Sequence, residues 1–444
     1  MTGVRKEAVI GYVPACWDIK PLAEVSDFIT KGGTPTTYGF DWADESNGIP
    51  FFRSECVTDE GFNPKGMNFI PAEAHNQMSR SEIKPGDLLM TITGNVGRVA
   101  KASERFSTAN INQHIARIRV LSDACADADF VYQCLKHQAY AIYYRAILTG
   151  QAYPQISLEQ VRGTPVAFPP LPEQKKIAAI LTAVDDKLDV IARQIEATQT
   201  LKQGLMQTLF SRGVGTQDAA GRWVPHAEFK DSEVGEIPSS WECRKLGSVL
   251  AQRPEYGANA SAVKFDAENR IRYLRITDID EYGRLRTDSI KAIQKDAAQD
   301  YMLKDGDLLI ARSGNTVGKS ILYRDCMGDC AFAGYLLRFR FNQSALVEFV
   351  AAYLASPTYW AWVKASVKVG AQPNINAQQY QSMLIPLPPL KEQEHIAEAL
   401  ASIEAKTELL RNRELHYKRL KRGLMQKLLT GEWRVKLDSS PGTA

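Results

Sequence analysis

The chain of 444 residues contains the stretch Pro169-Pro170-Leu171-Pro172-Glu173-Gln174, which returns later as Pro388-Pro389-Leu390-Lys391-Glu392-Gln393. Proline fixes a helix-compatible φ angle, and an acidic residue in the first turn favours a helix N-terminus. Each stretch therefore predicts the start of a helix. The same offset separates 204–207 from their copy at 423–426. An offset that stays near 220 residues predicts that the whole chain is an internal repeat of two copies.

A heptad pattern follows each stretch and predicts two long helices. A helix over 173–211 would be about 58 Å long at 1.5 Å per residue. A domain of about 150 residues cannot cover such a helix, so we expect the two helices to pack on each other as an antiparallel coiled coil. The predicted interface residues are Ile177, Leu181, Val184, Leu188, Ile191, Ile195, Leu205, Leu209, Ile396, Leu400, Ile403, Leu410, Tyr417, Leu424 and Leu428.

The segment before each helix also repeats, with Val13-Pro14-Ala15-Cys16-Trp17 returning as Ile237-Pro238-Ser239-Ser240-Trp241. Short β-branched and aromatic runs broken by Gly, Pro, Asn and Asp predict strands, followed by one helical segment at 130–148 and one at 349–367. The fold class is therefore mixed α/β (α+β) with a pseudo-two-fold repeat. The predicted boundaries are 1–168 and 214–387 for two globular domains, 169–213 and 388–434 for the long helices, and 435–444 for a tail.

Composition and charge are those of an ordinary globular protein. The 54 Lys+Arg and 51 Asp+Glu leave a net charge of +3, so a nucleic-acid surface would have to be local. Seven cysteines without a repeated CxxC spacing favour a reducing compartment. Because the sequence shows no apolar signal region and no uninterrupted apolar run of about 20 residues, we expect a cytoplasmic protein without a membrane segment.

The motifs of catalysis and metal binding are missing. The six histidines never pair at ligand spacing, and Cys326-x3-Cys330 stands alone, which favours free buried thiols over a zinc site. Residues 314–320 resemble a phosphate-binding loop, but the first glycine is one place too close and a strand is expected after it instead of a helix. A hairpin turn, or a turn whose amides and basic flank meet a phosphate, explains the segment better. We expect no cofactor in this chain.

Taken together, the repeated proline-rich stretches and the paired Gly-Asp-Leu-Leu turns resemble the specificity subunit of Type I restriction-modification enzymes, over nearly the whole chain. Lys31-Gly32-Gly33-Thr34-Pro35 and residues 91–97 also resemble target recognition domains of that family, whereas the second copy departs from the Gly-Gly-Thr-Pro pattern at 253–257. The resemblance implies a noncatalytic subunit that binds double-stranded DNA and two methyltransferase subunits. It also implies that two motor-nuclease subunits can join the complex. It also implies that S-adenosylmethionine, ATP and Mg are held by those partners.

Two domains related by a two-fold axis suit two DNA half-sites of opposite orientation, and their divergence predicts unlike half-sites. Base reading needs Arg, Lys, Asn and Gln on exposed loops. Each candidate is also compatible with an ordinary solvated side chain. The whole group is therefore better evidence for a DNA-binding surface than any single residue in it. The candidates are Lys31, Thr34, Arg53, Asn95, Arg98, Asn112, Gln113, Gln151, Tyr153, Gln155, Arg275, Arg312, Asn315, Lys319, Tyr335, Gln372 and Asn374.

The second long helix carries a basic stripe that either follows DNA phosphates, forms a solvated face or binds an acidic partner. Its members are Arg411, Arg413, Lys418, Arg419, Lys421, Arg422 and Lys427. Three other functions stay open at this point: a coiled-coil scaffold that binds only proteins, the specificity module of a methyltransferase-only system, and an enzyme with its own nuclease or methyltransferase activity. The missing catalytic motifs count against the enzyme.

Overall fold

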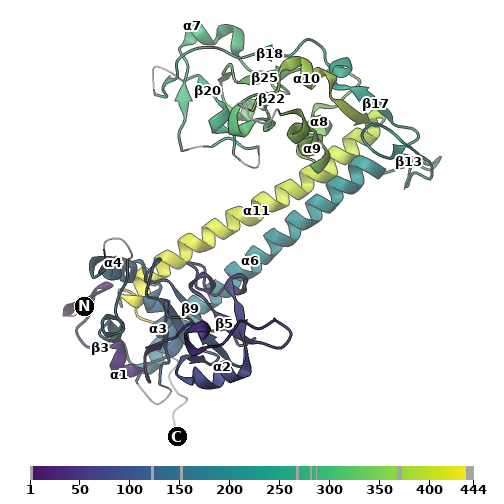
Figure 1. Cartoon of the computed structure of the whole chain (residues 1–444). Coiled ribbons are helices and arrows are strands. Elements are labelled where there is room, and N and C mark those ends of the chain that lie inside the picture. The colour runs from purple at the N-terminus through teal and green to yellow at the C-terminus, as the bar shows by residue number, and fades with distance from the viewer. Residues whose placement is uncertain are drawn as a thin grey trace. The chain divides into compact units, whose positions relative to one another are not determined.

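The computed structural model describes residues 4–121, 125–150, 154–266, 270–280, 283–286, 288–367 and 373–436. It divides into two compact units (Figure 1). Unit 1 comprises Met1–Ala192 with Asn412–Ala444, and unit 2 comprises Arg193–Arg411. Each unit therefore joins one globular domain to one end of both long helices.

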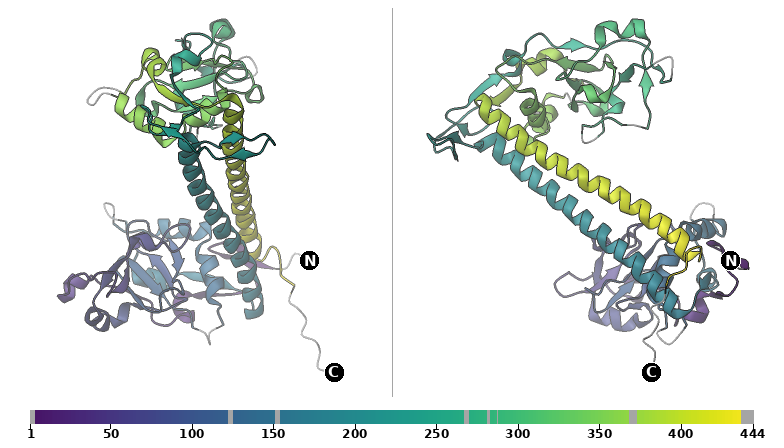
Figure 2. Two further views of the ribbon diagram at one scale, coloured as in Figure 1. Left: turned by 90° about the vertical axis from the view of Figure 1, so that its right-hand side faces the viewer. Right: turned by 180° about the vertical axis from the view of Figure 1, so that it is seen from behind.

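The long helices are α6 (Leu171–Arg212, 42 residues) and α11 (Leu390–Leu429, 40 residues). Within each unit they lie side by side and run in opposite directions (Figures 1 and 2). In unit 1 Lys421 Nζ donates to Asp185 Oδ1 at 2.6 Å, and in unit 2 Lys202 Nζ donates to Glu404 Oε2 at 2.6 Å. Both pairs fit one antiparallel register, since the step forward on α6 from Asp185 to Lys202 equals the step back on α11 from Lys421 to Glu404. The coiled coil predicted from the heptads is confirmed.

The predicted interface side chains of α6 and α11 are buried or half-buried. The buried ones are Ile177, Leu181, Val184, Ile191, Leu209, Ile396, Leu400, Leu410 and Leu428, and the half-buried ones are Leu188, Ile195, Leu205, Ile403, Tyr417 and Leu424. In unit 1 Ile177, Leu181 and Leu428 share one core with Trp17 and Phe130. The helix ends are therefore part of the domain cores rather than a separate layer.

The globular part of unit 1 is built from short strands and helices. They are β1 (Arg5–Ala8), β2 (Gly11–Pro14), β3 (Asp18–Pro21), α1 (Leu22–Val25), β4 (Thr30–Lys31), β5 (Ile49–Phe52), β6 (Asn68–Ile70), α2 (Ala72–Gln77), β7 (Glu82–Ile83), β8 (Leu88–Thr91), β9 (Val99–Lys101), β10 (Ala109–Ile111), β11 (Ile115–Ile118), α3 (Ala128–Leu135), α4 (Gln138–Ala146), α5 (Leu158–Arg162) and β12 (Pro165–Phe168).

The globular part of unit 2 follows the same plan. Its elements are β13 (Thr216–Gln217), β14 (Trp223–Val224), β15 (Phe229–Lys230), β16 (Ile237–Pro238), β17 (Glu242–Lys245), β18 (Glu255–Tyr256), β19 (Val263–Lys264), β20 (Arg272–Leu274), β21 (Lys291–Ala292), α7 (Lys295–Ala298), β22 (Leu308–Ala311), β23 (Ser320–Leu322), β24 (Cys330–Phe332), β25 (Leu336–Phe339), α8 (Val347–Tyr353), α9 (Pro357–Ser366), α10 (Ala377–Ser382) and β26 (Leu384–Leu387).

The repeat extends to the sheets. The central antiparallel sheet has the order β4-β11-β8-β9 in unit 1 and β18-β25-β22-β23 in unit 2. A parallel pair also recurs, β5 with β10 and β20 with β24, but the other strands of that second sheet are arranged differently in the two units. The central sheet is thus the common frame, and the second sheet is where the two units diverge.

The repeated motifs are structural. The Gly-Asp-Leu-Leu turn places Asp87 in the core at 3% exposure, where its carboxylate accepts from Arg119 Nε and Nη2 at 2.7 Å each. Asp307 accepts from Arg340 in the same way, at 2.6 and 3.0 Å. Because each aspartate is paired and takes two hydrogen bonds from a guanidinium group, its burial is compensated.

The glutamine of each proline-rich stretch ties the long helix to the domain before it. The Gln174 side chain accepts from Asp127 N and donates to the Cys125 and Pro169 carbonyl oxygens. Gln393 accepts from Leu346 N and donates to the Ser344 and Pro388 carbonyl oxygens. Both glutamines are fully buried, so each fixes where α6 or α11 leaves its domain.

One prediction about helices is wrong. The segments 130–148 and 349–367 are each two helices rather than one, α3 with α4 and α8 with α9. His137 begins α4 as an N-cap, its Nδ1 accepting from Ala139 N at 3.2 Å. Ser356 caps α9, whose first residue is Pro357, and a proline at that place cannot continue a preceding helix. The cap residues determine where each helix breaks, although the hydrophobic pattern continues across the break.

All seven cysteines are free. Cys330 is buried, and burial raises the pKa of its thiol to about 11, which favours an unreactive side chain. Cys326 is exposed, contrary to the expectation that both members of the Cys326-x3-Cys330 pair are buried.

Candidate nucleic-acid interface

Four loops of unit 1 meet at one edge of the central sheet and are held together by main-chain hydrogen bonds. Gly32 N donates to Asn112 O at 3.1 Å, Ile92 N to His114 O at 2.9 Å, and Gly94 N to Pro154 O at 3.0 Å. The backbone therefore gathers distant parts of the chain before any side chain is considered.

The predicted side chains on these loops fall into two groups. Lys31, Asn95 and Gln155 are exposed. Thr34 Oγ1 donates to Gln113 Oε1 at 2.8 Å, and Gln113 Nε2 lies 3.2 Å from His114 Nε2. These side chains present polar groups at the loop edge.

Three predicted residues of unit 1 are placed otherwise. Asn112 is 8% exposed, and its Oδ1 accepts from the His114 main chain at 3.1 Å, so it shapes the turn. Arg53 pairs with Glu55 at 2.8 Å, and Arg98 holds Asp59 through Nε and Nη2 at 3.1 and 3.0 Å. Both arginines already hold a carboxylate. Gln151, Tyr153 and, in unit 2, Gln372 lie outside the described residues.

The same edge of unit 2 repeats two of these hydrogen bonds and attaches its first loop by a different one. Arg312 N donates to Tyr335 O at 3.0 Å, and Gly314 N to Pro373 O at 2.9 Å. Gly334 N donates to Ala258 O at 2.8 Å and adds the fourth loop. The two edges are therefore equivalent in backbone while their side chains differ.

Arg312, Tyr335 and Asn374 come together on this edge of unit 2. The Arg312 guanidinium carbon lies 5.1 Å from the Tyr256 ring centre and 5.9 Å from that of Tyr335. Arg312 Nη1 donates to Asn374 Oδ1 at 3.3 Å. Beside them is a cavity of about 730 Å³, also lined by Arg275, whose guanidinium group is held by Asp278 through Nε and Nη2 at 3.1 and 2.7 Å.

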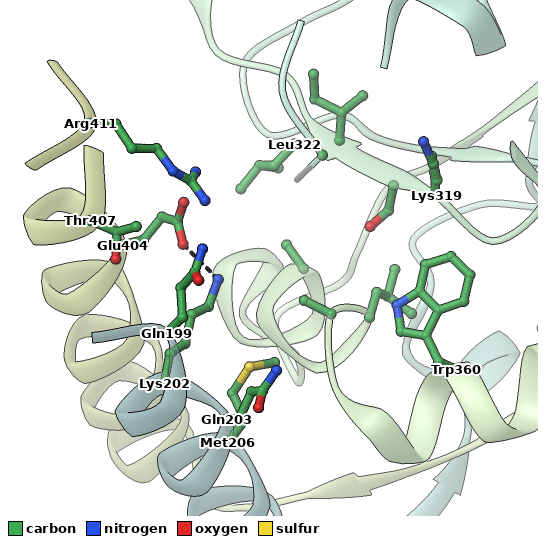
Figure 3. A pocket seen from close by; sticks show the side chains of 16 residues that line it. Gln199, Lys202, Gln203, Met206, Lys319, Leu322, Trp360, Glu404, Thr407 and Arg411 are labelled. Carbon is green, nitrogen blue, oxygen red and sulfur yellow. Dashed lines mark hydrogen bonds and ion pairs between the residues drawn. The ribbon is translucent and has the colours of Figure 1, made fainter. Parts of the chain in front are cut away.

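Lys319 faces a different cavity of unit 2, of about 620 Å³ (Figure 3). Lys319 and Trp360 lie on one side, and Lys202, Glu404 and Arg411 of the long helices on the other (Figure 3). Asn315 is exposed on the hairpin between β22 and β23. A strand, β23, begins at the serine of the Gly-Lys-Ser segment, so the prediction that a strand rather than a helix continues this segment is confirmed.

Glu404 belongs to an ion-pair network in unit 2. It accepts from Lys202, and it also pairs with Arg284, which in turn pairs with Glu408. Burial favours the neutral acid, but the hydrogen bonds from Lys202 and Arg284 outweigh it and lower the pKa of Glu404. The network stabilises the junction of helix and domain as long as Glu404 is ionised.

The loop edge requires glycine at one place in each unit. A Cβ atom on Gly32 would lie 1.6 Å from the Ile111 carbonyl oxygen, and one on Gly257 would lie 2.4 Å from the Ala333 carbonyl oxygen. Gly257 therefore makes the close backbone crossing that Gly32 makes, although 253–257 lacks the Gly-Gly-Thr-Pro pattern. The preceding residue, Tyr256, is 47% exposed and was missed as a candidate. A strand-forming residue just before a glycine was the available signal.

The basic stripe of α11 is not one free cationic surface. Lys418 pairs with Glu414 at 2.7 Å, Lys421 with Asp185 at 2.6 Å, and Lys427 with Glu432. Exposed cations remain at Arg413, Arg419 and Arg422. This pairing reduces the charge available to phosphates or to an acidic partner.

Within the described ranges, no cluster of three or more His, Cys, Asp or Glu side chains is arranged to hold a metal ion. In the same ranges, no helix combines the length and the apolar character that crossing a membrane requires. What the geometry offers is two polar loop edges on a common frame, which defines a recognition module present in two copies.

The comparisons identify this class. The family model described as "Type I restriction modification DNA specificity domain" matches residues 14–199 and 238–416, one match per copy of the repeat. The chain therefore belongs to this family, and it is a noncatalytic DNA-specificity subunit of a type I restriction-modification system.

Relatives of known name agree. The MjaVIII specificity subunit of Methanocaldococcus jannaschii is 30% identical over 295 residues, which are 65% of this chain and 66% of that protein, just under two thirds of each. The putative MjaX specificity subunit of the same organism is 25% identical over 97% of both chains. In fold, the chain is similar to a crystal structure of the S subunit from M. genitalium, with a TM-score of 0.60, 15% identity, and coverage of 93% of this chain and 96% of that one.

Proposed function

We propose that this chain reads a bipartite, asymmetric DNA site with one half-site per globular domain, and that it positions methyltransferase subunits on that site. The observation that carries the proposal is the pair of loop edges with common main-chain hydrogen bonds and different side chains. A shared backbone frame presents each domain's loops to DNA in the same way, and different side chains select different bases.

The long helices supply a reason for two partner subunits. Leu201 and Gly204 on α6 recur as Leu420 and Gly423 on α11, and the leucines are 54% and 41% exposed. Gly204 and Gly423 lie in the interiors of their helices, and a Cβ atom on either would have no atom within 4 Å. Exposed leucine beside glycine favours close approach of a partner helix. We infer that one methyltransferase subunit docks at each face, with S-adenosylmethionine bound by that partner.

Restriction subunits that use ATP and Mg are proposed as further partners of the assembled complex. Neither cofactor is assigned to residues of this chain. The three predicted arginines that hold carboxylates, Arg53, Arg98 and Arg275, are proposed as supports of the loops rather than as base readers.

The test is co-expression of this chain with a type I methyltransferase subunit in a host that lacks other adenine methylation, followed by long-read detection of modified adenines. The proposal predicts one split motif with two unlike halves and a fixed gap, absent without this chain. A stable complex that modifies no motif would contradict it. A variant of the loop edge supplies a second test: Gly257→Ala should remove modification while the chain is still expressed in soluble form.

A further inference from the structure

Arg312 in unit 2 has a guanidinium group that is fixed in place on one side and unengaged on the other. Its Nε donates to the Gly334 carbonyl oxygen at 3.1 Å and its Nη1 to Asn374 Oδ1 at 3.3 Å. Nη2 and the second N–H of Nη1 have no partner among the described residues. These remaining donors form a two-pronged fork.

The guanidinium group also makes cation–π contacts with the rings of Tyr256 and Tyr335. Both rings are exposed, at 47% and 57%, and Arg312 itself is half-buried, so this cluster lies at the surface of unit 2. None of the ion pairs within the described residues involves Arg312. Arg275, on the same cavity, differs because Asp278 occupies its Nε and Nη2.

We propose that Arg312 reads a guanine in the half-site bound by unit 2, and that Tyr256 and Tyr335 act as positioning residues for its guanidinium group. This inference rests on the proposed half-site function. A guanine presents O6 and N7 as neighbouring acceptors in the major groove, and a fixed guanidinium fork meets both at once. Lysine also donates to guanine, but its single rotating ammonium group lacks the planar fork of the guanidinium group.

The reading is confined to one half-site. In unit 1 the place of Arg312 is taken by Ile92, because Ile92 N donates to His114 O and Ile92 O accepts from Ile156 N, as Arg312 does with Tyr335 and Ile375. Ile92 is 3% exposed and contributes no donor. The same position of the common frame is thus a base reader in one unit and a core residue in the other.

The test compares Arg312→Gln with Arg244→Gln in the full complex with its methyltransferase. Arg244 is an exposed arginine of β17 in the same unit, paired with Glu242, so both variants remove one cation. We expect Arg312→Gln to lower the preference for guanine at one position of the second half-site by roughly ten- to a hundredfold. All other positions of the motif should be retained, and Arg244→Gln should leave the motif unchanged.

Oligonucleotides carrying inosine or 7-deazaguanine at that position supply a second measurement. Wild type should bind the inosine site as it binds guanine, since inosine keeps O6 and N7, and should lose affinity for 7-deazaguanine, which lacks N7. Arg312→Gln should bind the guanine and the 7-deazaguanine sites equally. Two results with the Arg312→Gln complex would overturn the inference: a motif that is unchanged, or modification that decreases to the same extent at all sites whatever their sequence. If the glutamine variant does not assemble, Arg312→Met decides, since it keeps an unbranched side chain, removes every donor and should still lose the guanine preference. Failure of the proposed function looks different, because wild type itself would then show no split motif.

Discussion

Replacing Gly204 or Gly423 with alanine should stabilise the helix and weaken the assembly. Glycine in a helix interior costs about 1 kcal/mol relative to alanine. Neither position has an atom within 4 Å of where the Cβ would lie, so nothing in the chain opposes this gain. Amide exchange in the turns around each site should slow by about fivefold, the equivalent of that free energy.

The affinity for the methyltransferase should change in the opposite direction. If a partner helix lies against the glycine, the added methyl group overpacks the contact by about 1–3 kcal/mol, which raises the dissociation constant by about five- to a hundredfold. Hydrogen exchange by mass spectrometry and sedimentation of the complex measure the two effects. Ala192→Gly, exposed on another face of α6, is the control and should destabilise its helix without affecting assembly. Slower exchange with unchanged affinity would refute the docking face.

Three further outcomes follow from contacts within each unit. Lys421→Ala should lower the stability of unit 1 by about 1–3 kcal/mol, because Asp185, which also accepts from Gln133 Nε2, is left with a half-buried charge and no cation. Combining Lys421→Met with Asp185→Asn removes both charges and keeps an acceptor for Gln133, so it should recover most of the loss; additive losses in thermal melts would contradict the pair. The lowered pKa of Glu404 means that its contribution is present above the ordinary glutamate value of 4.5 and is lost as the pH falls through the lowered value. The difference in melting temperature between wild type and Glu404→Gln should therefore narrow as the pH falls below 4.5, and a difference that does not change with pH would be inconsistent. Gly32→Ala should displace its loop, since the Cβ would lie 1.6 Å from a main-chain oxygen of β10, and should abolish methylation in cells; normal methylation would show that the crossing is not needed.

Much of the fold was predictable because its signals are periodic or repeated. The nearly constant offset, the proline-rich helix starts and the heptads predicted two domains and an antiparallel coiled coil. The breaks at His137 and Pro357 were not predicted, because a hydrophobic pattern continues across a cap.

The candidate interface was predictable as a set of loops but not in its individual roles. Nothing in the sequence shows that Asp59 neutralises Arg98 whereas Arg312 contacts two tyrosine rings. Such partners are fixed by strand pairing over long separations. Tyr256 was missed for the same reason, since its value depends on a glycine crossing that is visible only in space.

The make-up of the units has a consequence for synthesis on the ribosome. Unit 2 is one continuous segment, Arg193–Arg411, whereas unit 1 needs Asn412–Ala444 in addition to Met1–Ala192. Met425, Leu428 and Leu429 belong to the core that contains Trp17. At roughly 5–20 residues per second, the translation of unit 2 takes about ten to forty seconds. The domain made first is therefore completed last, and until then its exposed core is a natural substrate for chaperones.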